Sequence, residues 1–358
     1  MEKKLLMGVL SCICLLWACQ SGSQTTLSVG EKQAEVRLAM AETMTSLSMV
    51  CHDTQGKYWF ANGLDAVYSW EGDSLIHYPA LGVYKEQRLL SVQEDEKGNL
   101  FFDTNGGVIR MEGTTIEQLE VADTVRAGAW TAQPQDLWFR MGWEHKGAFR
   151  YDGERLHFME FPRHPLDTGP YSSQQSYNSY GLYSLYKDSS GGLWFGTASL
   201  GLFYFDGSQL YTLYDADLSI TRGGGEFGIR SIIEGREGYL WVNRADIKIK
   251  LAEVQEKGDS VLKQLRYERL PGITDERISS AFFFNFAYDG QGHLWFSDNG
   301  MKLWHYDAKD LHLVEPEQKG EHPEYSGLRA DREGKIWVNI LTKGPCFWDG
   351  EKFDRFLN

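Results

Sequence analysis

A short aromatic phrase recurs seven times along this 358-residue chain, and no other feature constrains the fold as strongly. Each copy follows the pattern Gly-x-apolar-aromatic-apolar or a close variant, and Gly191-Gly192-Leu193-Trp194-Phe195 is the most regular copy. The anchor aromatics stand 37 to 56 residues apart: Trp59, Phe101, Trp138, Trp194, Trp241, Trp295 and Trp337. Repeats of roughly 40–50 residues with strand signals are typical of propeller blades. The repeat therefore predicts seven blades.

Turn signals divide each repeat into four expected strands, A to D. An acid usually precedes the Gly by three residues, as Asp188 precedes Gly191, and marks the turn from strand A to strand B. An acid-Gly pair such as Asp206-Gly207 follows strand C and marks the next hairpin. We therefore predict an all-β protein, a seven-bladed β-propeller of four-stranded antiparallel blades over residues 44–358. The first and last repeats are complete, so closing the ring requires no strand exchange.

Two repeats depart from this pattern. The third has Gln133-Pro134-Gln135-Asp136 where the others have the acid-x-x-Gly turn. In the fifth, an insert near residues 251–263 replaces the acid-Gly hairpin.

The fourth repeat resembles the two-component regulator propeller repeat. The matching residues are Asp188, Gly191, Trp194, Phe195, Gly196, Thr197, Gly201, Asp206 and Gly207. The resemblance covers roughly residues 44–358 and implies a propeller similar to the periplasmic sensor domains of hybrid two-component systems, many of which look like glycan sensors. The chain ends within its last repeat, so we expect a stand-alone propeller. Streptogramin-lyase propellers look similar and are enzymes, so the fold leaves the function open.

The N-terminus reads as a targeting segment. Lys3 and Lys4 precede an apolar run from Leu5 to Ala18 that is short for a membrane-spanning helix. The run ends in Leu16-Trp17-Ala18-Cys19, which resembles a bacterial lipobox. We predict a lipoprotein signal peptide over residues 1–18 and a lipid on Cys19. Residues 19–43 would form a flexible tether, because the segment after Cys19 is rich in Ser, Thr, Gly and Gln.

The net charge and the expected cellular location narrow the range of possible partners. The net charge is −14, and loss of residues 1–18, which removes one Glu and two Lys, gives −14 − 1 = −15. Such an acidic chain repels nucleic acid, so no nucleic-acid partner is expected. We expect a cell-envelope protein that is bound to the membrane through Cys19 and faces the periplasm or the cell exterior. Its expected partner is a glycan or an envelope protein. The outer membrane, facing the periplasm, is the favoured location.

The sequence assigns no catalytic residue, cofactor or metal. Neither H-E-x-x-H nor C-x-x-C occurs, and the nine histidines are scattered along the chain. The turn aspartates lack the alternating spacing of a calcium loop. Cys51 and Cys346 are expected as free, buried thiols because they fall toward opposite faces.

The working surface should be the face where B–C turns and D–A connections emerge together. The long connections of this face are 161–179, 214–227, 270–277 and 314–325, and ligand sites favour such loops. The least repeat-like B–C turn carries a Trp with a flanking Arg, Glu and His, which could offer sugars a flat platform and hydrogen bonds. The candidate ligand-binding residues are Arg140, Trp143, Glu144, His145, Arg163, His164, Tyr171 and Tyr177.

Three functions stay open at this point. The first is a binding module for a glycan or a partner protein. The second is a lyase or hydrolase that uses the same loop face, and the third is a structural subunit of an envelope complex. The alternative for Trp143 is that it seals the gap between the third and fourth blades.

Overall fold

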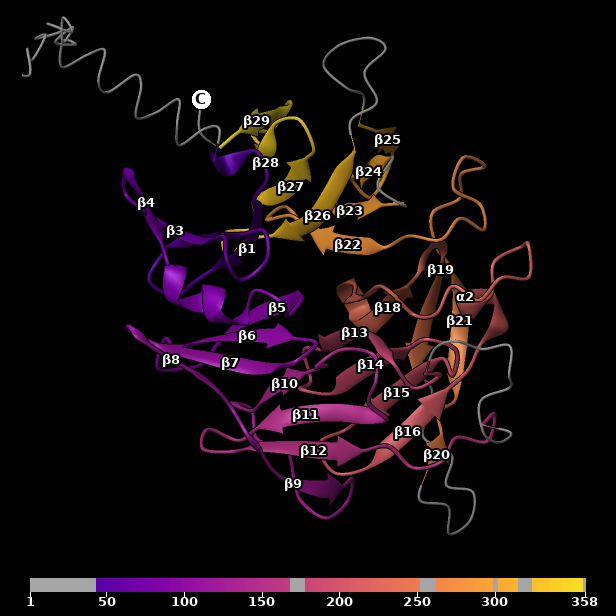
Figure 1. The fold of residues 1–358 in the computed structure, drawn as a ribbon. Coiled ribbons are helices and arrows are strands. Elements are labelled where there is room, and N and C mark those ends of the chain that lie inside the picture. Colours follow the sequence, from indigo (N-terminus) through magenta and orange to yellow (C-terminus); the bar gives the residue numbers. More distant parts are fainter. Residues whose placement is uncertain (1–42, 168–177, 252–261, 299–301, 315–323, 357–358) are drawn as a thin grey trace, which may run out of the picture. The chain divides into compact units, whose positions relative to one another are not determined.

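Seven β-sheets surround a common centre in the computed structural model (Figure 1). They all belong to the unit Met40–Asn358. The structure describes residues 43–167, 178–251, 262–298, 302–314 and 324–356. Each sheet is built mostly from consecutive antiparallel strands, which confirms the seven-bladed propeller predicted from the aromatic repeat.

The blades are numbered in chain order. Blade 1 contains β1 (Ser48–His52), β2 (Tyr58–Ala61), β3 (Val67–Glu71) and β4 (Ser74–His77), and blade 2 contains β5 (Leu89–Glu94), β6 (Leu100–Thr104), β7 (Gly107–Glu112) and β8 (Thr115–Gln118). Blade 3 contains β9 (Val121–Arg126), β10 (Leu137–Phe139), β11 (Gly147–Tyr151) and β12 (Leu156–Glu160), and blade 4 contains β13 (Leu182–Lys187), β14 (Leu193–Thr197), β15 (Leu202–Phe205) and β16 (Leu210–Leu213).

The remaining blades and the short helices complete the unit. Blade 5 contains β17 (Ile232–Glu234), β18 (Tyr239–Val242), β19 (Arg244–Leu251) and β21 (Tyr267–Pro271), with β20 (Lys263–Gln264) before its last strand. Blade 6 contains β22 (Asn285–Tyr288), β23 (Leu294–Ser297), β24 (Leu303–Tyr306) and β25 (Leu311–Leu313), and blade 7 contains β26 (Tyr325–Ala330), β27 (Ile336–Ile340), β28 (Gly344–Trp348) and β29 (Phe353–Arg355). The helical turns are η1 (Pro79–Tyr84), α2 (Ala216–Ser219) and η2 (Arg236–Gly238).

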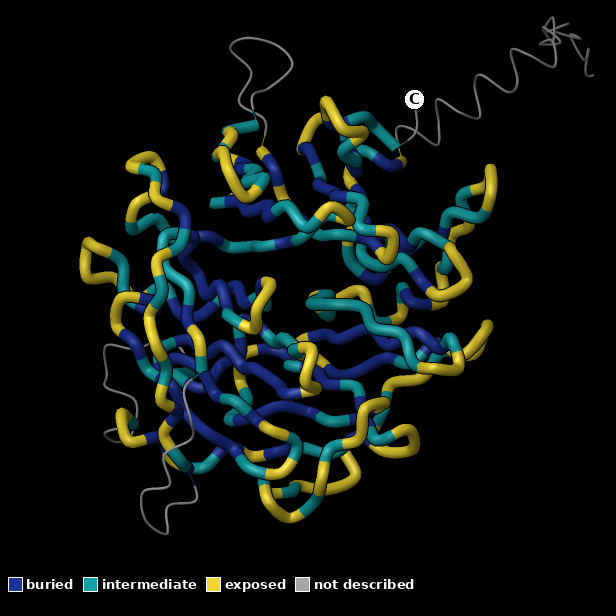
Figure 2. Tube along the Cα trace, turned by 180° about the vertical axis from the view of Figure 1, so that it is seen from behind, coloured by how far each residue is buried: buried dark blue, intermediate teal, exposed yellow. Residues whose placement is uncertain are grey.

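The aromatic repeat folds this way because strand side chains alternate between the two faces of each blade. Trp59 packs into the apolar cluster shared with blade 2, whereas the next residue, Phe60, packs into the cluster shared with blade 7. Each of the seven anchor aromatics lies in a different one of the seven apolar clusters. The buried residues accordingly follow the strands, and exposure is concentrated in the turns (Figure 2).

The acidic residue of the A–B turn holds the anchor Trp in place by accepting a hydrogen bond from its indole N–H. Asp188 accepts backbone N–H bonds within its turn and also the indole N–H of Trp194 at 2.9 Å. The same bond from indole to carboxylate recurs at the equivalent positions of blades 1, 6 and 7. The turn and the core are therefore locked together by one side chain.

Blade 3 corrects the prediction of four antiparallel strands in every blade. It has no strand on the inner side of β10; β9 instead pairs in parallel with β12 at the outer edge. The sequence before β10 helps to explain this, because Pro134 lacks an N–H for a strand ladder. In its place at the outer edge, Val121–Arg126 is almost entirely exposed. Side chains from the neighbouring blades partly fill the inner position: Gln93 donates to the Trp138 carbonyl at 2.6 Å, and Lys187 donates to the Pro134 carbonyl at 2.5 Å.

The irregular fifth repeat contributes to its neighbour. β20 pairs in parallel with β16, so blade 4 has five strands, and β21 then completes blade 5 beside β19. Most of the insert predicted near 251–263 lies outside the described residues.

Blades 1 and 7 close the ring without exchanging a strand, as predicted. Cys51 and Cys346 are free thiols, but only Cys346 is fully buried. None of the helices that the structure describes is long and apolar enough to cross a bilayer. The predicted signal peptide, Cys19 and the tether up to residue 42 lie outside the described residues.

Candidate ligand-binding site at the channel mouth

A cavity of about 560 Å³ lies between the inner edges of blades 2, 4, 5 and 6 and β10 of blade 3. Its walls include Ser91 and Gln93 of blade 2, Ser184 of blade 4 and Ser231 of blade 5. Trp138 and Arg140 also line it, because no inner strand of blade 3 separates β10 from the channel. The missing strand therefore widens the channel on one side.

A smaller pocket of about 240 Å³ forms the mouth of this cavity. The two share six lining residues, so the pocket opens into the channel. The mouth is lined by Arg88, Leu89, Leu90, Arg140, Trp143, Tyr183, Arg230, Phe284 and Asn285.

Arg140 ties the mouth together across the gap in blade 3. Its guanidinium donates to the Tyr183 carbonyl at 2.7 Å and to the Leu90 carbonyl at 3.0 Å, which joins the inner strands of blades 4 and 2. The same guanidinium lies 3.8 Å from the carboxylate of Asp103, which is almost fully buried. Burial raises the pKa of Asp103 and lowers the pKa of Arg140, while their mutual attraction opposes both shifts. The charge of Arg140 is thus largely committed to the fold.

The Asp103 carboxylate also shapes the turn that presents Trp143. It accepts the backbone N–H groups of Arg140 and Met141 at 3.1 and 3.0 Å. Met141 and Gly142 then adopt left-handed φ angles of 50° and 86°, which turn the chain out of the blade. Trp143 follows with 41% of its surface exposed.

Two arginines contact aromatic rings at the mouth. The guanidinium carbon of Arg88 lies 4.9 Å from the centre of the Trp143 ring. That of Arg230 lies 4.3 Å from the Tyr183 ring and 5.1 Å from the Phe284 ring, and its Nε donates to the Phe227 carbonyl at 2.9 Å. Such stacking holds a guanidinium in place while its edge keeps N–H donors available.

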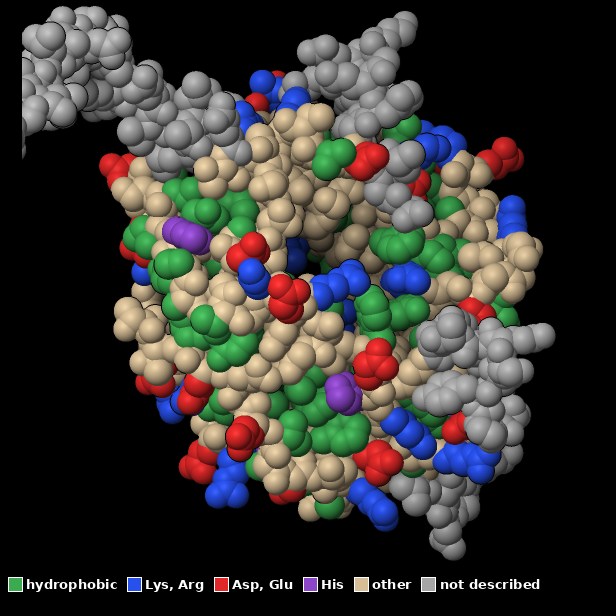
Figure 3. Space-filling model, in the orientation of Figure 1, with side chains coloured by type: hydrophobic (Ala, Val, Ile, Leu, Met, Phe, Trp, Pro, Cys, Tyr) green, Lys and Arg blue, Asp and Glu red, His purple; other side chains and the backbone are tan. Residues whose placement is uncertain are grey.

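The mouth is positively charged in a strongly acidic protein. Three arginines and no carboxylate are among the described residues that line the 240 Å³ pocket, whereas the whole chain has a net charge of −14. Figure 3 shows several Lys and Arg side chains around the central opening, with acidic side chains beside some of them. Arg140 is paired with Asp103, so the charges of Arg88 and Arg230 are the ones that let this pocket favour an anionic group.

The structure separates the residues that the sequence grouped as one site. Arg140 and Trp143 line the mouth together. Glu144 is exposed, and His145 is half-buried with its ring 4.9 Å from that of Phe149; neither lines the mouth. Burial lowers the pKa of His145, which favours the neutral form of its imidazole.

Arg163 and His164 lie on the connection between blades 3 and 4 and belong to a second hydrogen-bond network, separate from the mouth. Arg163 is exposed and donates to the Asp167 carbonyl at 3.0 Å. His164 does not reach the surface: it is 3% exposed, its Nε2 lies 2.7 Å from the Thr212 hydroxyl, and its Nδ1 accepts the Leu166 N–H. Burial lowers the pKa of His164 to about 4. Tyr171 and Tyr177 lie outside the described residues.

Sequence reasoning missed the aromatic and basic residues that come from the inner strands. Tyr183, Arg230 and Phe284 each stand eleven residues before the anchor Trp of their repeat. Equal positions in successive blades meet around the axis, so aligning the repeats could have found them.

Comparisons with known proteins support the repeat and the fold. The family model described as two component regulator propeller matches residues 176–199, which confirms the resemblance carried by the fourth repeat. No curated protein matches the sequence.

Similar solved structures include propellers from sensor, enzyme and secretion proteins. The extracellular domain of BT4673 from B. thetaiotaomicron, described as part of a one-component or hybrid two-component system, is 16% identical with a TM-score of 0.57; the match covers 85% of this chain and 38% of that one. Virginiamycin B lyase from Staphylococcus aureus is 14% identical with a TM-score of 0.55, covering 84% of this chain and 93% of the lyase. PorZ, a surface component of the type-IX secretion system of Porphyromonas gingivalis, is 13% identical with a TM-score of 0.53, covering 84% and 46%. At these identities the likeness is one of fold.

Proposed function

We propose that this chain is a ligand-binding module of the bacterial cell envelope, anchored through a lipid on Cys19, that binds a glycan or a partner protein at the channel mouth. The observation that carries the proposal is the mouth itself: an exposed Trp143 under Arg88, beside Arg140 and Arg230. A flat ring beside guanidinium groups suits a sugar ring that bears a carboxylate or sulfate. An acidic glycan is therefore the favoured ligand.

Binding is favoured over catalysis by the chemistry of the mouth. Among the described residues that line it there is neither a histidine nor a carboxylate that could act as acid or base. The nearby Asp103 is almost fully buried and engaged by Arg140 and two backbone N–H groups. The similarity to virginiamycin B lyase is one of fold and supplies no argument for catalysis at this mouth.

The exposed apolar surface favours binding over a purely structural role. The described residues include six exposed large apolar side chains: Ile76, Val83, Val121, Trp143, Leu166 and Leu341. They come from blades 1, 3 and 7 and from connections between blades, whereas a stable subunit interface needs one broad patch.

The binding test uses the purified full chain and an array of neutral and acidic glycans. We expect acidic glycans to bind wild type, and Trp143→Ala to weaken binding by about 1–3 kcal/mol. Arg230→Ala should reduce the preference for acidic over neutral glycans, and Val83→Ala, at an exposed position outside the mouth, should change nothing. Equal binding by wild type and Trp143→Ala would refute the site. A partner captured in a pull-down that Trp143→Ala abolishes would favour the protein ligand.

The anchor is tested separately. Metabolic labelling with a fatty-acid analogue should mark wild type and leave Cys19→Ala unmarked. Equal labelling of both would exclude Cys19 as the lipidated residue.

A further inference from the structure

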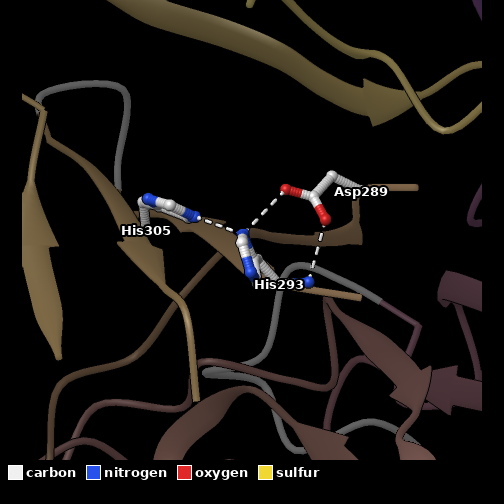
Figure 4. A group of neighbouring side chains, drawn as sticks. All are labelled: Asp289, His293 and His305. Atoms are coloured by element: carbon white, nitrogen blue, oxygen red, sulfur yellow. Dashed lines mark hydrogen bonds and ion pairs between the residues drawn. The ribbon is translucent and has the colours of Figure 1, made fainter. Parts of the chain in front are cut away.

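Blade 6 brings together three potential metal ligands that are separated along the sequence. Among the described residues, one group of histidine, cysteine and carboxylate side chains has three ligand atoms within 4.8 Å of one another: Asp289, His293 and His305 (Figure 4). Asp289 and His293 belong to the A–B turn, and His305 lies on β24. In a propeller, the A–B turns emerge on the face opposite the B–C turns, so this group is separate from the channel mouth.

The repeat itself shows which of these residues the fold explains. Asp289 accepts two backbone N–H bonds and the Trp295 indole, as the turn acids of other blades do. The two histidines have no such explanation. The position of His293, two residues before the anchor aromatic, is Lys57 in blade 1 and Lys335 in blade 7.

The position of His305 varies in the same way. It pairs across the sheet with Trp295, and its counterparts are Ser69, Arg110, Arg150, Tyr204 and Phe347. In blade 3 the two positions form the ion pair of Asp136 and Arg150. Among the described blades, blade 6 alone places two imidazoles there, directly beside the turn carboxylate.

The distances suit a metal ion. His305 Nε2 lies 3.2 Å from His293 Nδ1, and His293 Nδ1 lies 3.4 Å from Asp289 Oδ2. Two ligands at about 2.0–2.1 Å from a tetrahedral Zn²⁺ are about 3.3 Å apart. The Trp295 ring stacks on His305 with centroids 4.2 Å apart, which orients the imidazole.

The group is also open enough for an ion to enter. The side chains of His293 and Asp289 are 27% and 13% exposed. Asp289 Oδ2 keeps a lone pair after accepting the indole N–H. Two imidazoles and one carboxylate are the ligand set that zinc and neighbouring divalent transition metals prefer over calcium or magnesium.

We propose that Asp289, His293 and His305 bind one divalent transition-metal ion of the zinc class. The ion clips the A–B turn of blade 6 to β24 and leaves its remaining coordination positions to water or to a side chain of a partner. The site is independent of the proposed glycan-binding mouth.

The test titrates Zn²⁺ and Co²⁺ into the metal-stripped full chain. We expect one equivalent to bind, with visible absorption bands for Co²⁺ and a higher melting temperature with Zn²⁺. His293→Lys places at this position the residue found in blades 1 and 7, so it should fold, and it should weaken binding about tenfold or more. His305→Ala should have the same effect.

His77→Ala, which removes an exposed histidine of blade 1, is the matched control and should bind as wild type does. The melting temperature of each variant without metal reports whether it folds. The proposal is overturned if wild type binds neither ion, or if folded His293→Lys binds both ions with the affinity of wild type.

Discussion

At the scale of single residues, burial separates the tryptophans that hold the fold from the one available to a ligand. Trp194 is 1% exposed, and its ring lies 4.4 Å from that of Tyr204, whereas Trp143 is 41% exposed. The sequence distinguishes them by position, because Trp194 recurs once per repeat and Trp143 falls in a turn that breaks the pattern. A recurring aromatic marks packing between blades, and a solitary one has to be explained by its own surroundings.

Replacing Trp194 tests this distinction. Trp194→Ala should lower the free energy of unfolding by roughly 3–5 kcal/mol, because it leaves a cavity and removes the indole bond to Asp188 in the blade with the most regular repeat. Trp143→Ala should cost less than about 1 kcal/mol. Urea denaturation of both variants measures the two values. A Trp194→Ala protein as stable as wild type would show that this ring does not carry the packing assigned to it.

His164 makes stability depend on pH. Its pKa is lowered by burial from 6.5 to about 4 in the folded chain, so the unfolded chain binds more protons between these values. The contribution of His164 to the free energy of unfolding is therefore fully present above pH 6.5. It falls as the pH drops toward about 4, with a slope of at most about 1.4 kcal/mol per pH unit.

The variant His164→Gln removes this titration. Its free energy of unfolding should be lower than that of wild type at neutral pH, because the bond to Thr212 is altered, but should fall less steeply below pH 6.5. The free energy of unfolding of both proteins is measured at several pH values. The difference between them removes the contribution that the carboxylates make to both. Parallel curves would contradict the assignment.

At the scale of elements, the aromatic repeat predicted the B strands well because one strong signal marks each of them. All seven anchor aromatics lie in the second strand of a blade or, in blade 3, in β10. The missing inner strand of blade 3 was not foreseen, although Pro134 and the absent acid-x-x-Gly turn were visible. Those signals indicate that the A–B hairpin is lost. They do not indicate where Val121–Arg126 pairs instead, because that depends on the free outer edge of β12 in the folded blade.

Arg140 should compensate for that missing strand. Arg140→Met removes the bonds to the Tyr183 and Leu90 carbonyls and leaves the buried Asp103 without its cation. We expect a loss of about 3–5 kcal/mol in the free energy of unfolding. Arg88→Ala, at an exposed arginine of the same mouth, should cost less than about 1 kcal/mol. Thermal and urea denaturation of both variants test this prediction. Similar stabilities of the two variants would mean that Arg140 does not stabilise the gap in blade 3.

At the scale of the whole propeller, the candidate site exists only because successive blades are arranged around a common centre. Arg88, Trp143, Tyr183, Arg230 and Phe284 come from five consecutive blades or their connections, and no local pattern unites them. The metal group is different, because His293 and His305 come from one blade and are brought together by the pairing of the neighbouring strands β23 and β24. Sequence reasoning predicted the loop face and one irregular turn. Aligning the repeats could also have grouped Tyr183, Arg230 and Phe284, whereas Arg88 and Trp143 do not share that repeat position.

Ring closure itself depends on side chains at the seam between blades 1 and 7. Phe356 follows the last strand, and its ring lies 5.0 Å from that of Phe60, 5.4 Å from that of Trp70 and 5.2 Å from that of Trp337. Because no strand crosses this seam, side chains hold it: these rings, the buried Met44, Leu47 and Met49 of the same apolar cluster, and hydrogen bonds such as Tyr58 hydroxyl to Asp331 at 3.1 Å.

Phe356→Ala should therefore open the seam. We expect it to lower the free energy of unfolding by roughly 2–4 kcal/mol, somewhat less than for a fully buried Phe because the ring is only half-buried. Val83→Ala, which truncates an apolar side chain that is 76% exposed, should have almost no effect. Amide hydrogen exchange should show faster exchange in β1 and β27 of Phe356→Ala than in β14, since the blades beside the seam lose their shared core first. Uniformly faster exchange in all blades would instead mean that the propeller unfolds as one unit and that the seam is no weaker than the other six interfaces.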